Sequence, residues 1–296
     1  GVPLQLAMGF TPLIDGLVQS QSLEELVIEE RVLDVVSLRT KPEVLIEATA
    51  QPPCEAIAIA KLVEKNSQLR NVNLGNISMI AEVGEALKSV VDALPNLETV
   101  TINGILFPLL RLQTAQTTLA FTDAALPKHF GRIIASVITR SSALEELDLR
   151  GHNFEDHNVD IADAAADMKG LSVYNKIPLM PQDSTLDLSG KKIMQHGVAM
   201  LCKRTLTGGV AIVNLDVSYS GLDGSSMATL ADGILSTHSV TSLNISGNSL
   251  GVQGIAALAD DLLAVNPFVR TLEARSIGFE TSDPRELPQS IEKLSR

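Results

Sequence analysis

Residues 240–250 read VTSLNISGNSL, and this stretch decides the class of fold. Leu243 and Ile245 alternate with polar neighbours, which is typical of a short strand with one buried face. The same spacing of apolar positions recurs in the next segment of the chain and in the two before it. These segments start at residues 183, 212, 240 and 269, at steps of 29, 28 and 29 residues. A period of this length indicates a protein built from stacked repeats.

The same frame continues less regularly toward the N-terminus. Further units start at Leu23, Leu69, Leu97 and Leu144, which gives eight units in all. The gaps of 46 residues after Leu23, 47 after Leu97 and 39 after Leu144 are too long for one unit and interrupt the period.

The second half of each unit has a helical period. In residues 251–265 the apolar side chains recur every three or four positions, and residues 223–235, 194–206 and 78–94 repeat the pattern. Pro95 follows the last of these segments and is expected to end its helix. Each strand–helix pair exposes an apolar face that only a neighbouring pair can cover, so the units have to stack.

These units resemble the leucine-rich-repeat family, in particular its ribonuclease-inhibitor-like class. In that class a small residue opens each helix, and Gly197, Ser226 and Gly254 hold this position here. The resemblance implies an α/β fold, a leucine-rich-repeat solenoid with a parallel sheet on the concave side and helices on the convex side. The family's asparagine, whose amide ties adjacent turns together, is present at Asn248. The same slot elsewhere holds Arg31, Ile77, Ile105, His152, Lys191, Ser220 and Ile277. We therefore expect an irregular horseshoe.

The repeats predict three parts of the chain. Residues 1–22 form an apolar N-terminal segment, residues 23–282 form the leucine-rich-repeat solenoid, and residues 283–296 form a polar C-terminal cap. Caps are expected because the ends of a solenoid must be shielded from water. Residues 108–126 are interpreted as an insertion within the unit that starts at Leu97.

Composition and charge exclude several classes of protein and partner. The chain has a formal net charge of −12, which disfavours a nucleic-acid backbone as partner. No window of about 18–20 residues is apolar throughout, so no membrane span is expected. Cys54 and Cys202 lie far apart, which favours free thiols in a reducing compartment, with one long-range disulfide as the alternative. The first residue is Gly1 and not Met, which is compatible with a tag scar, a cropped sequence or a removed targeting presequence such as a mitochondrial one.

The densest group of potential metal ligands lies in residues 152–160, HNFEDHNVD. His and carboxylate side chains bind zinc and other transition metals, but His152 and His157 are five positions apart. The alternative, which we favour, is a turn with Asp156 near the positive end of a helix dipole. No nucleophile motif is present, and Cys202 is expected to be a buried, inert thiol. We predict no enzyme activity, no catalytic residue, no cofactor, no metal and no small-molecule substrate.

The residue between two buried positions of each strand is expected to point away from the core. This outward row is small, polar and mildly acidic, with no aromatic anchor. A plain solvated sheet face is the interpretation that we favour, and a binding groove for a basic protein is the alternative. The predicted partner-binding residues of the row are Asp148, Asp187, Asp216, Asn244 and Glu273.

The expected insertion is a second candidate surface, because it is unusually apolar. Its candidate partner-binding residues are Leu109, Leu110, Leu112, Leu119 and Phe121. Leaving a large apolar side chain exposed forgoes about 1.5–3 kcal/mol of burial. We therefore expect this segment to be covered, either by residues 1–20 or by another subunit.

The sequence favours a non-catalytic protein–protein interaction scaffold that works by shape. Its high hydropathy and scarce charge suit a structural or accessory subunit of a large assembly, inside the cell in the cytoplasm or an organelle matrix such as that of the mitochondrion. Two alternatives share this repeat class: a small-GTPase regulator resembling the Ran GTPase-activating protein and a cytoskeletal capping module resembling tropomodulin.

Overall fold

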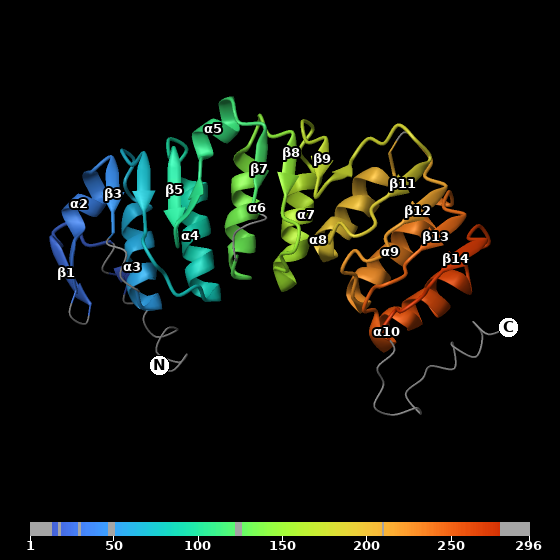
Figure 1. Ribbon diagram of the computed structural model, residues 1–296. Coiled ribbons are helices and arrows are strands. Elements are labelled where there is room, and N and C mark those ends of the chain that lie inside the picture. Colours follow the sequence, from blue (N-terminus) through green and yellow to red (C-terminus); the bar gives the residue numbers. More distant parts are fainter. Residues whose placement is uncertain are drawn as a thin grey trace. The chain divides into compact units, whose positions relative to one another are not determined.

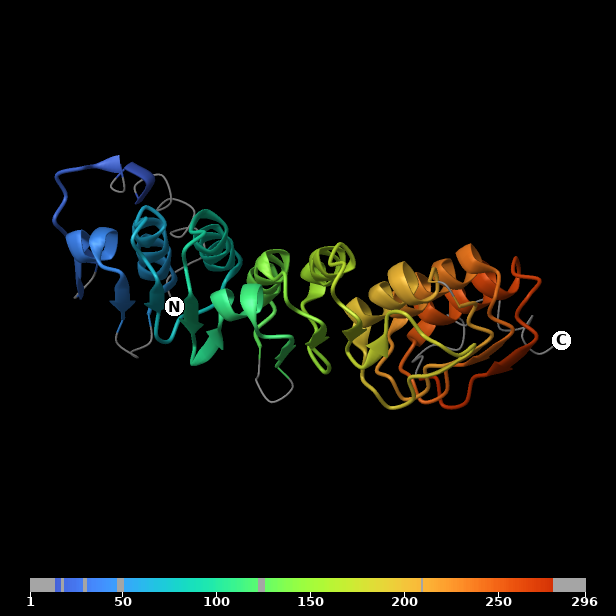
Figure 2. The same cartoon turned by 90° about the horizontal axis from the view of Figure 1, so that it is seen from above.

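The computed structural model describes residues 14–16, 19–28, 31–46, 51–121, 126–208 and 210–278. The chain divides into two compact units, which are described one at a time. Unit 1 comprises residues 1–116 and 127–143, and unit 2 comprises residues 117–126 and 144–296. In each unit, short strands alternate with helices along the chain, and the helices cover one face of the strands (Figures 1 and 2).

Unit 1 contains six strands and five helices among its described residues. They are β1 (Glu25–Ile28), β2 (Arg31–Asp34), α2 (Val35–Thr40), β3 (Glu43–Leu45), α3 (Pro53–Val63), β4 (Asn71–Asn73), α4 (Ala81–Ala93), β5 (Thr99–Ile102), β6 (Ile105–Phe107), α5 (Leu109–Thr114) and α6 (Phe130–Arg140). The helix α4 ends directly before Leu94 and Pro95, as the sequence indicated.

The main sheet of unit 1 has the order β3-β4-β5-β6. The first three strands are parallel, with Val44 opposite Val72 and Val72 opposite Val100. The fourth strand returns antiparallel to β5 through a turn at Asn103 and Gly104. Both turn residues have positive φ angles, 53° and 76°, which is the conformation that suits a tight hairpin.

The first expected repeat, from Leu23 to Leu33, is not a parallel unit. It forms an antiparallel hairpin of β1 and β2, with Val27 opposite Val32, and this pair is a separate two-stranded sheet. The prediction of a repeat here was wrong because alternating apolar residues also fit a hairpin, and a single weak unit gives no period to separate the two.

The described residues of unit 2 contain eight strands, with helices between most of them. They are β7 (Thr118–Ala120), β8 (Glu146–Asp148), the 3₁₀ turn η1 (Glu155–His157), α7 (Asn158–Ala166), β9 (Val173–Tyr174), β10 (Ile177–Pro178), β11 (Thr185–Asp187), α8 (Met194–Met200), the π-helical turn η2 (Leu201–Thr205), β12 (Asn214–Asp216), α9 (Gly224–Thr237), β13 (Ser242–Asn244), α10 (Gly251–Ala256), the π-helical turn η3 (Ala257–Leu263) and β14 (Thr271–Glu273).

Two four-stranded sheets form in unit 2. The first has the order β10-β9-β8-β7, in which β10 is the one antiparallel strand. The second, β11-β12-β13-β14, is parallel throughout, with Leu186, Leu215, Leu243 and Leu272 in one register across the four strands. The parallel pairing expected from the repeat over residues 183–279 is therefore confirmed for its described part.

Each of the three irregular gaps in the repeat contains a parallel strand that the sequence did not reveal. The strand β3 pairs with β4 at a step of 28 residues, since Glu43 lies opposite Asn71. The strand β7 pairs with β8 at the same step, because Thr118 lies opposite Glu146. The strand β9 follows β8 and places a buried tyrosine, Tyr174, opposite Leu147.

Residues 108–126 are not an insertion within the unit that starts at Leu97, because their strand β7 belongs to the next parallel array. They contain the helix α5, which packs against α6 and β5, and the strand β7 of the parallel sheet. Residues 122–125 of this segment lie outside the described part, as does the expected C-terminal cap 283–296. The expected N-terminal segment 1–22 is described only at 14–16 and 19–22.

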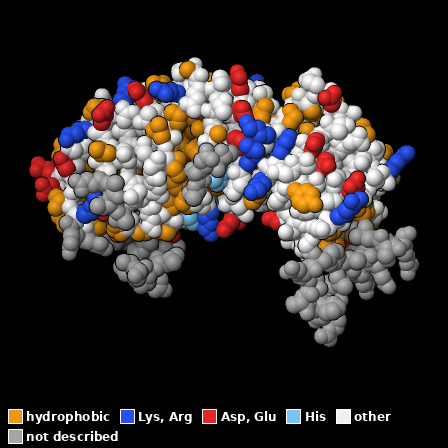
Figure 3. All heavy atoms as spheres, viewed as in Figure 1, with side chains coloured by type: hydrophobic (Ala, Val, Ile, Leu, Met, Phe, Trp, Pro, Cys, Tyr) orange, Lys and Arg blue, Asp and Glu red, His pale blue; other side chains and the backbone are white. Residues whose placement is uncertain are grey.

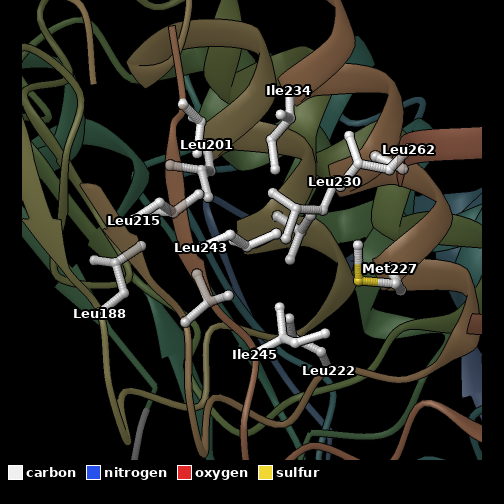
Figure 4. Close-up of a cluster of buried hydrophobic side chains, with 14 of the residues drawn as sticks. Leu188, Leu201, Leu215, Leu222, Met227, Leu230, Ile234, Leu243, Ile245 and Leu262 are labelled. Atoms are coloured by element: carbon white, nitrogen blue, oxygen red, sulfur yellow. The ribbon is translucent and has the colours of Figure 1, made fainter. Parts of the chain in front are cut away.

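The largest described core of unit 2 lies between the strands β11–β14 and their helices (Figure 4). Leu215 and Leu243 extend from the strands toward Leu230 and Ile234 of α9, and all four are at most 2% exposed. Leu272 is half-buried, since β14 has no further described strand beyond it. A burial of this kind is worth about 1.5–3 kcal/mol for each large side chain.

Small residues let neighbouring helices approach closely. A Cβ atom on Gly254 would lie 3.0 Å from the Cα atom of Gly224, so these two glycines bring the starts of α9 and α10 together. The residue before α9, Asp223, caps the helix because its Oδ1 atom accepts a hydrogen bond from the backbone N–H of Ser226 at 2.8 Å.

Three buried side chains tie the turn after one strand to the preceding unit. The Nδ2 atom of Asn248 donates to the carbonyl oxygen of Val217 at 2.9 Å. In the equivalent slots, the Oγ atom of Ser220 donates to Leu188 O at 2.7 Å and His152 Nε2 lies 2.7 Å from Phe121 O. Serine and histidine therefore occupy the tying position that asparagine was expected to hold.

The core predicts the effect of one truncation. Replacing Leu243, which is 0% exposed, with Ala should lower the free energy of unfolding by about 2–5 kcal/mol, because the lost burial is compounded by a cavity. Urea unfolding followed by circular dichroism measures this loss. Val265→Ala is the matched control, since Val265 is 61% exposed, and it should change stability by less than about 0.5 kcal/mol. Equal losses in the two variants would contradict the assignment.

Candidate protein-interaction surface

The five predicted residues of the outward row do not share one environment. Asp187 and Glu273 are exposed, whereas Asp216 and Asn244 are partly buried. Asp148 is only 3% exposed, so the expectation that it is free for a partner was wrong. It is enclosed because Arg150 folds over it, with the Nε and Nη2 atoms 2.9 Å from its two carboxylate oxygens.

The acidic and amide side chains of the row first serve the turns that follow the strands. In each case one side-chain oxygen accepts a hydrogen bond from the backbone N–H two residues later. The pairs are Asn73 with Gly75 (3.0 Å), Asp148 with Arg150 (3.2 Å), Asp187 with Ser189 (2.9 Å), Asp216 with Ser218 (2.8 Å) and Asn244 with Ser246 (3.1 Å). This geometry explains why Asp and Asn recur at this slot, independently of any partner.

The carboxylates of the row differ in how many of their oxygen atoms already accept hydrogen bonds. Both oxygens of Asp216 are used, because Oδ2 accepts from the Nδ2 atom of Asn244 at 3.0 Å. Hydrogen bonds from the side chain and backbone of Ser189 lower the pKa of Asp187, which therefore keeps its negative charge. Burial alone would raise the pKa of Asp148, but hydrogen bonds from Arg150 outweigh it and lower the pKa.

Within unit 2, the sheet β11–β14 has acidic but no basic residues at the outward positions of its strands. These positions are Thr185, Asp187, Asn214, Asp216, Ser242, Asn244, Thr271 and Glu273. In the first sheet of unit 2, Arg150 and Lys176 follow β8 and β9 and pair with Asp148 and Glu146. In Figure 3, Lys and Arg side chains gather over this part of the same face. Lys191 and Arg275 follow β11 and β14 of the second sheet, and Lys191 donates to the backbone carbonyl of Asp187.

An exposed aromatic side chain borders the acidic sheet, although the sequence did not single it out. Tyr219, in the turn after β12, is 65% exposed. Its ring lies against Gly247 in the next turn, where an added Cβ atom would come within 2.3 Å of the ring. The equivalent positions in the turns after β11 and β14 hold Gly190 and Ser276. Tyr219 is the one bulky residue in this series, and its size was the signal in the sequence that pointed to this position. Tyrosine is among the residues that most often dominate binding energy at protein interfaces.

Most of the second set of predicted binding residues belongs to the core. Leu109, Leu112, Leu119 and Phe121 are buried, so they are not available to a partner in the folded chain. The reason is that they lie on α5 and on or directly after β7, which are elements of the repeat. Leu110 alone among the five is exposed, at 43%.

The residues weighed as metal ligands do not converge. The Nδ1 atom of His157 lies 3.5 Å from Asp160, while His152 is engaged with the carbonyl of Phe121. Across the described ranges, no three His, Cys, Asp or Glu side chains are placed to share a metal ion. Both cysteines are free thiols, and burial raises the pKa of Cys202 to about 12. No helix in the described part of the chain is long and apolar enough to cross a membrane.

The similarity of this chain to known proteins is distant. No protein-family model matches the sequence, and no curated protein matches it. A solved structure from Bacteroides fragilis shares 14% identity over 96% of this chain and 74% of its own, with a TM-score of 0.24. An internalin from Listeria monocytogenes shares 14% identity over 97% of this chain and 92% of its own, with a TM-score of 0.21. At these TM-scores neither likeness bears on function.

A buried polar cluster joins the first and second sheets of unit 2. The hydroxyl group of Tyr174 and the Nδ2 atom of Asn175 both approach Nδ1 of His196, at 2.8 and 3.3 Å. The Nε2 atom of His196 lies 3.0 Å from the carbonyl oxygen of His152. Because Asn175 Oδ1 already accepts from the backbone N–H of Leu149, its NH₂ group must face the ring. The neutral imidazole with its proton on Nε2 therefore satisfies every partner.

Protonation of His196 conflicts with this arrangement. A proton on Nδ1 would point at the amide hydrogens of Asn175, and a charged ring would be buried without a carboxylate to pair with it in the cluster. Burial accordingly lowers the pKa of His196 from 6.5 to about 4. Between these two pH values the unfolded chain takes up a proton that the folded chain does not.

The cluster predicts a loss of stability in mild acid. The contribution of His196 is fully present above pH 6.5 and declines toward pH 4, by about 3 kcal/mol in all, because protons favour the unfolded state in this window. Urea unfolding at a series of pH values between 7 and about 4.5 measures the slope. The variant His196→Gln, which does not titrate, should show a flatter slope. An unchanged slope would refute this account.

Proposed function

We propose that the chain is a leucine-rich-repeat protein of the ribonuclease-inhibitor-like class that binds another protein and catalyses no reaction. Two observations support the class: the repeat of 28 or 29 residues in the sequence, and the parallel strand pairing at that same step. Low charge, 20% of residues, and a mean hydropathy of +0.20 favour a role as an accessory subunit of a larger assembly. These observations support a role as a protein-binding scaffold.

The outward face of β11–β14 is the surface that we assign to this partner. The observation that carries the assignment is its combination of two exposed carboxylates, Asp187 and Glu273, with the exposed ring of Tyr219. The rest of the face is small and polar, so an extended segment could lie close to the strands. A partner of positive charge fits best, because the strands of this sheet present no cation on that face.

The test compares two triple variants of the chain as bait in an extract of the native source. The surface variant carries Asp187→Asn, Glu273→Gln and Tyr219→Ala. The control variant carries Asp260→Asn, Asp261→Asn and Val265→Ala, which remove the same charge and one exposed apolar side chain from η3 and the residues after it. Asp148 and Asp216 are left intact, since their hydrogen bonds hold the turns.

The partner recovered with the native chain should bind the surface variant at least about 30-fold more weakly, since loss of a central tyrosine alone costs about 2 kcal/mol. The control variant should bind normally. Binding to the native chain should also weaken as salt rises, because exposed charges are screened beyond about 8–10 Å. A partner that binds the surface variant as tightly as the native chain would refute the assignment.

A further inference from the structure

A groove of about 620 Å³ lies in unit 1 between the hairpin strand β2 and the first strand of the parallel sheet, β3. One wall is formed by residues 31–34 and the other by residues 43–46, with α2 and Glu55 of α3 also in its lining. No residue of β4 lines it, so the groove runs along the side of β3 that faces away from the sheet.

That side of β3 is an open strand edge. Toward β4, the carbonyl oxygen of Pro42 accepts from Asn71 and the N–H of Ile46 donates to Asn73. Backbone groups alternate in direction along a strand, so those of Glu43 and Leu45 point into the groove. Within the described residues, neither makes a backbone hydrogen bond on that side. An unpaired edge of this kind is a template for one further strand.

The corresponding edge of the second parallel sheet in unit 2 is protected. There the strand β11 begins the sheet, and the Nζ atom of Lys191 donates to the edge carbonyl of Asp187 at 2.9 Å. A lysine placed over an edge is a common way to prevent unwanted strand pairing. Among the described residues, no side chain does this for Glu43 or Leu45, and both residues line the groove.

The walls of the groove favour a particular kind of strand. Leu45 is 76% exposed and Val32 is 60% exposed, which provides apolar contact on both sides. Glu43, two residues before Leu45, presents a carboxylate on the same face as Leu45. The pair of Arg31 and the buried Glu55, 2.8 Å apart, holds β2 against α3 and satisfies both charges. Asp34 and Lys41 also line the groove, but Asp34 accepts hydrogen bonds from Ser37, and Lys41 lies before the first residue of β3. Glu43 is therefore the charged residue within β3 that an incoming strand would meet.

We propose that an extended segment of a partner protein pairs with β3 as an additional strand in this groove. The segment places a Lys or Arg opposite Glu43 and an aliphatic side chain opposite Leu45, with a further aliphatic residue between them facing Leu33 and Val44. Main-chain hydrogen bonds to Glu43 and Leu45 supply affinity, and the two cross-strand pairs supply specificity. This site lies on a different unit from the face assigned above and does not depend on it.

The probe is the peptide acetyl-Thr-Val-Val-Lys-Val-Val-Thr-amide, whose sequence reads the same in both directions and so fits a parallel or an antiparallel strand. Hydrogen exchange of the full chain is followed by NMR with peptide up to about 1 mM. The edge-facing amides of Glu43 and Leu45 should exchange at least about tenfold more slowly with peptide, while that of Val44 should be unchanged. The same peptide N-methylated at every residue cannot donate, and it should protect nothing.

Variants of the chain distinguish strand pairing at β3 from nonspecific hydrophobic binding of the peptide. Both variants remove the leucine side chain. Leu45→Pro also removes the backbone N–H that faces the groove, without affecting a hydrogen bond to β4, and should abolish binding. Leu45→Ala keeps this N–H and should weaken binding by about threefold to tenfold. Leu106→Ala is the matched control, because Leu106 is an exposed leucine at the far end of the same row of the sheet. It should leave binding unchanged.

Several results would overturn the proposal. One is equal protection by the N-methylated peptide, and another is no protection at Glu43 and Leu45 at the highest concentration. Slow exchange of these amides in the free, monomeric chain would mean that its own residues occupy the edge. Protection that appears with rising chain concentration, together with a dimer in analytical ultracentrifugation, would assign the edge to a second copy.

Discussion

Every strand in the described parallel sheets is only two to four residues long, so the chain has to turn almost as soon as a ladder begins. The backbone groups in these turns are buried between units, and each one left unpaired would cost about 1–3 kcal/mol. Asn248, Ser220 and His152 meet this requirement from equivalent positions, each reaching a carbonyl group of the preceding unit. Three residue types therefore supply a short or planar donor at this slot, whereas Ile77, Ile105 and Ile277 hold the same slot without one.

The same requirement shapes the outward face. The residues at the ends of β11, β12 and β13 place no side chain in the core, but a side-chain oxygen of each accepts a hydrogen bond from the N–H two positions on. A row of aspartates that resembles a binding surface is thus in large part a row of turn caps. The groups on this face that stay exposed to a partner are the carboxylates of Asp187 and Glu273 and the ring of Tyr219.

The edges of the sheets differ in whether they are protected from pairing with a further strand. The first two parallel arrays end in an antiparallel strand, β6 or β10, joined by a tight turn. The array that starts at β11 has Lys191 over its edge. The edge of β3 has neither device and adjoins a groove with apolar walls. An acidic face on unit 2 and an open strand edge on unit 1 would recognise chemically distinct partners.

The sequence alone determined the repeat, the parallel register over residues 185–273 and the burial of Leu215 and Leu243, because a strict period fixes which side chains share a face. It did not reveal β3, β7 or β9, whose buried slots hold a valine, a leucine and a tyrosine. Tyr174 fits the core only because His196, 22 residues later, accepts a hydrogen bond from its hydroxyl group. Likewise, Asp148 is enclosed because Arg150 turns back over it. Such burial depends on which distant groups meet in space, and only the tertiary structure decides that.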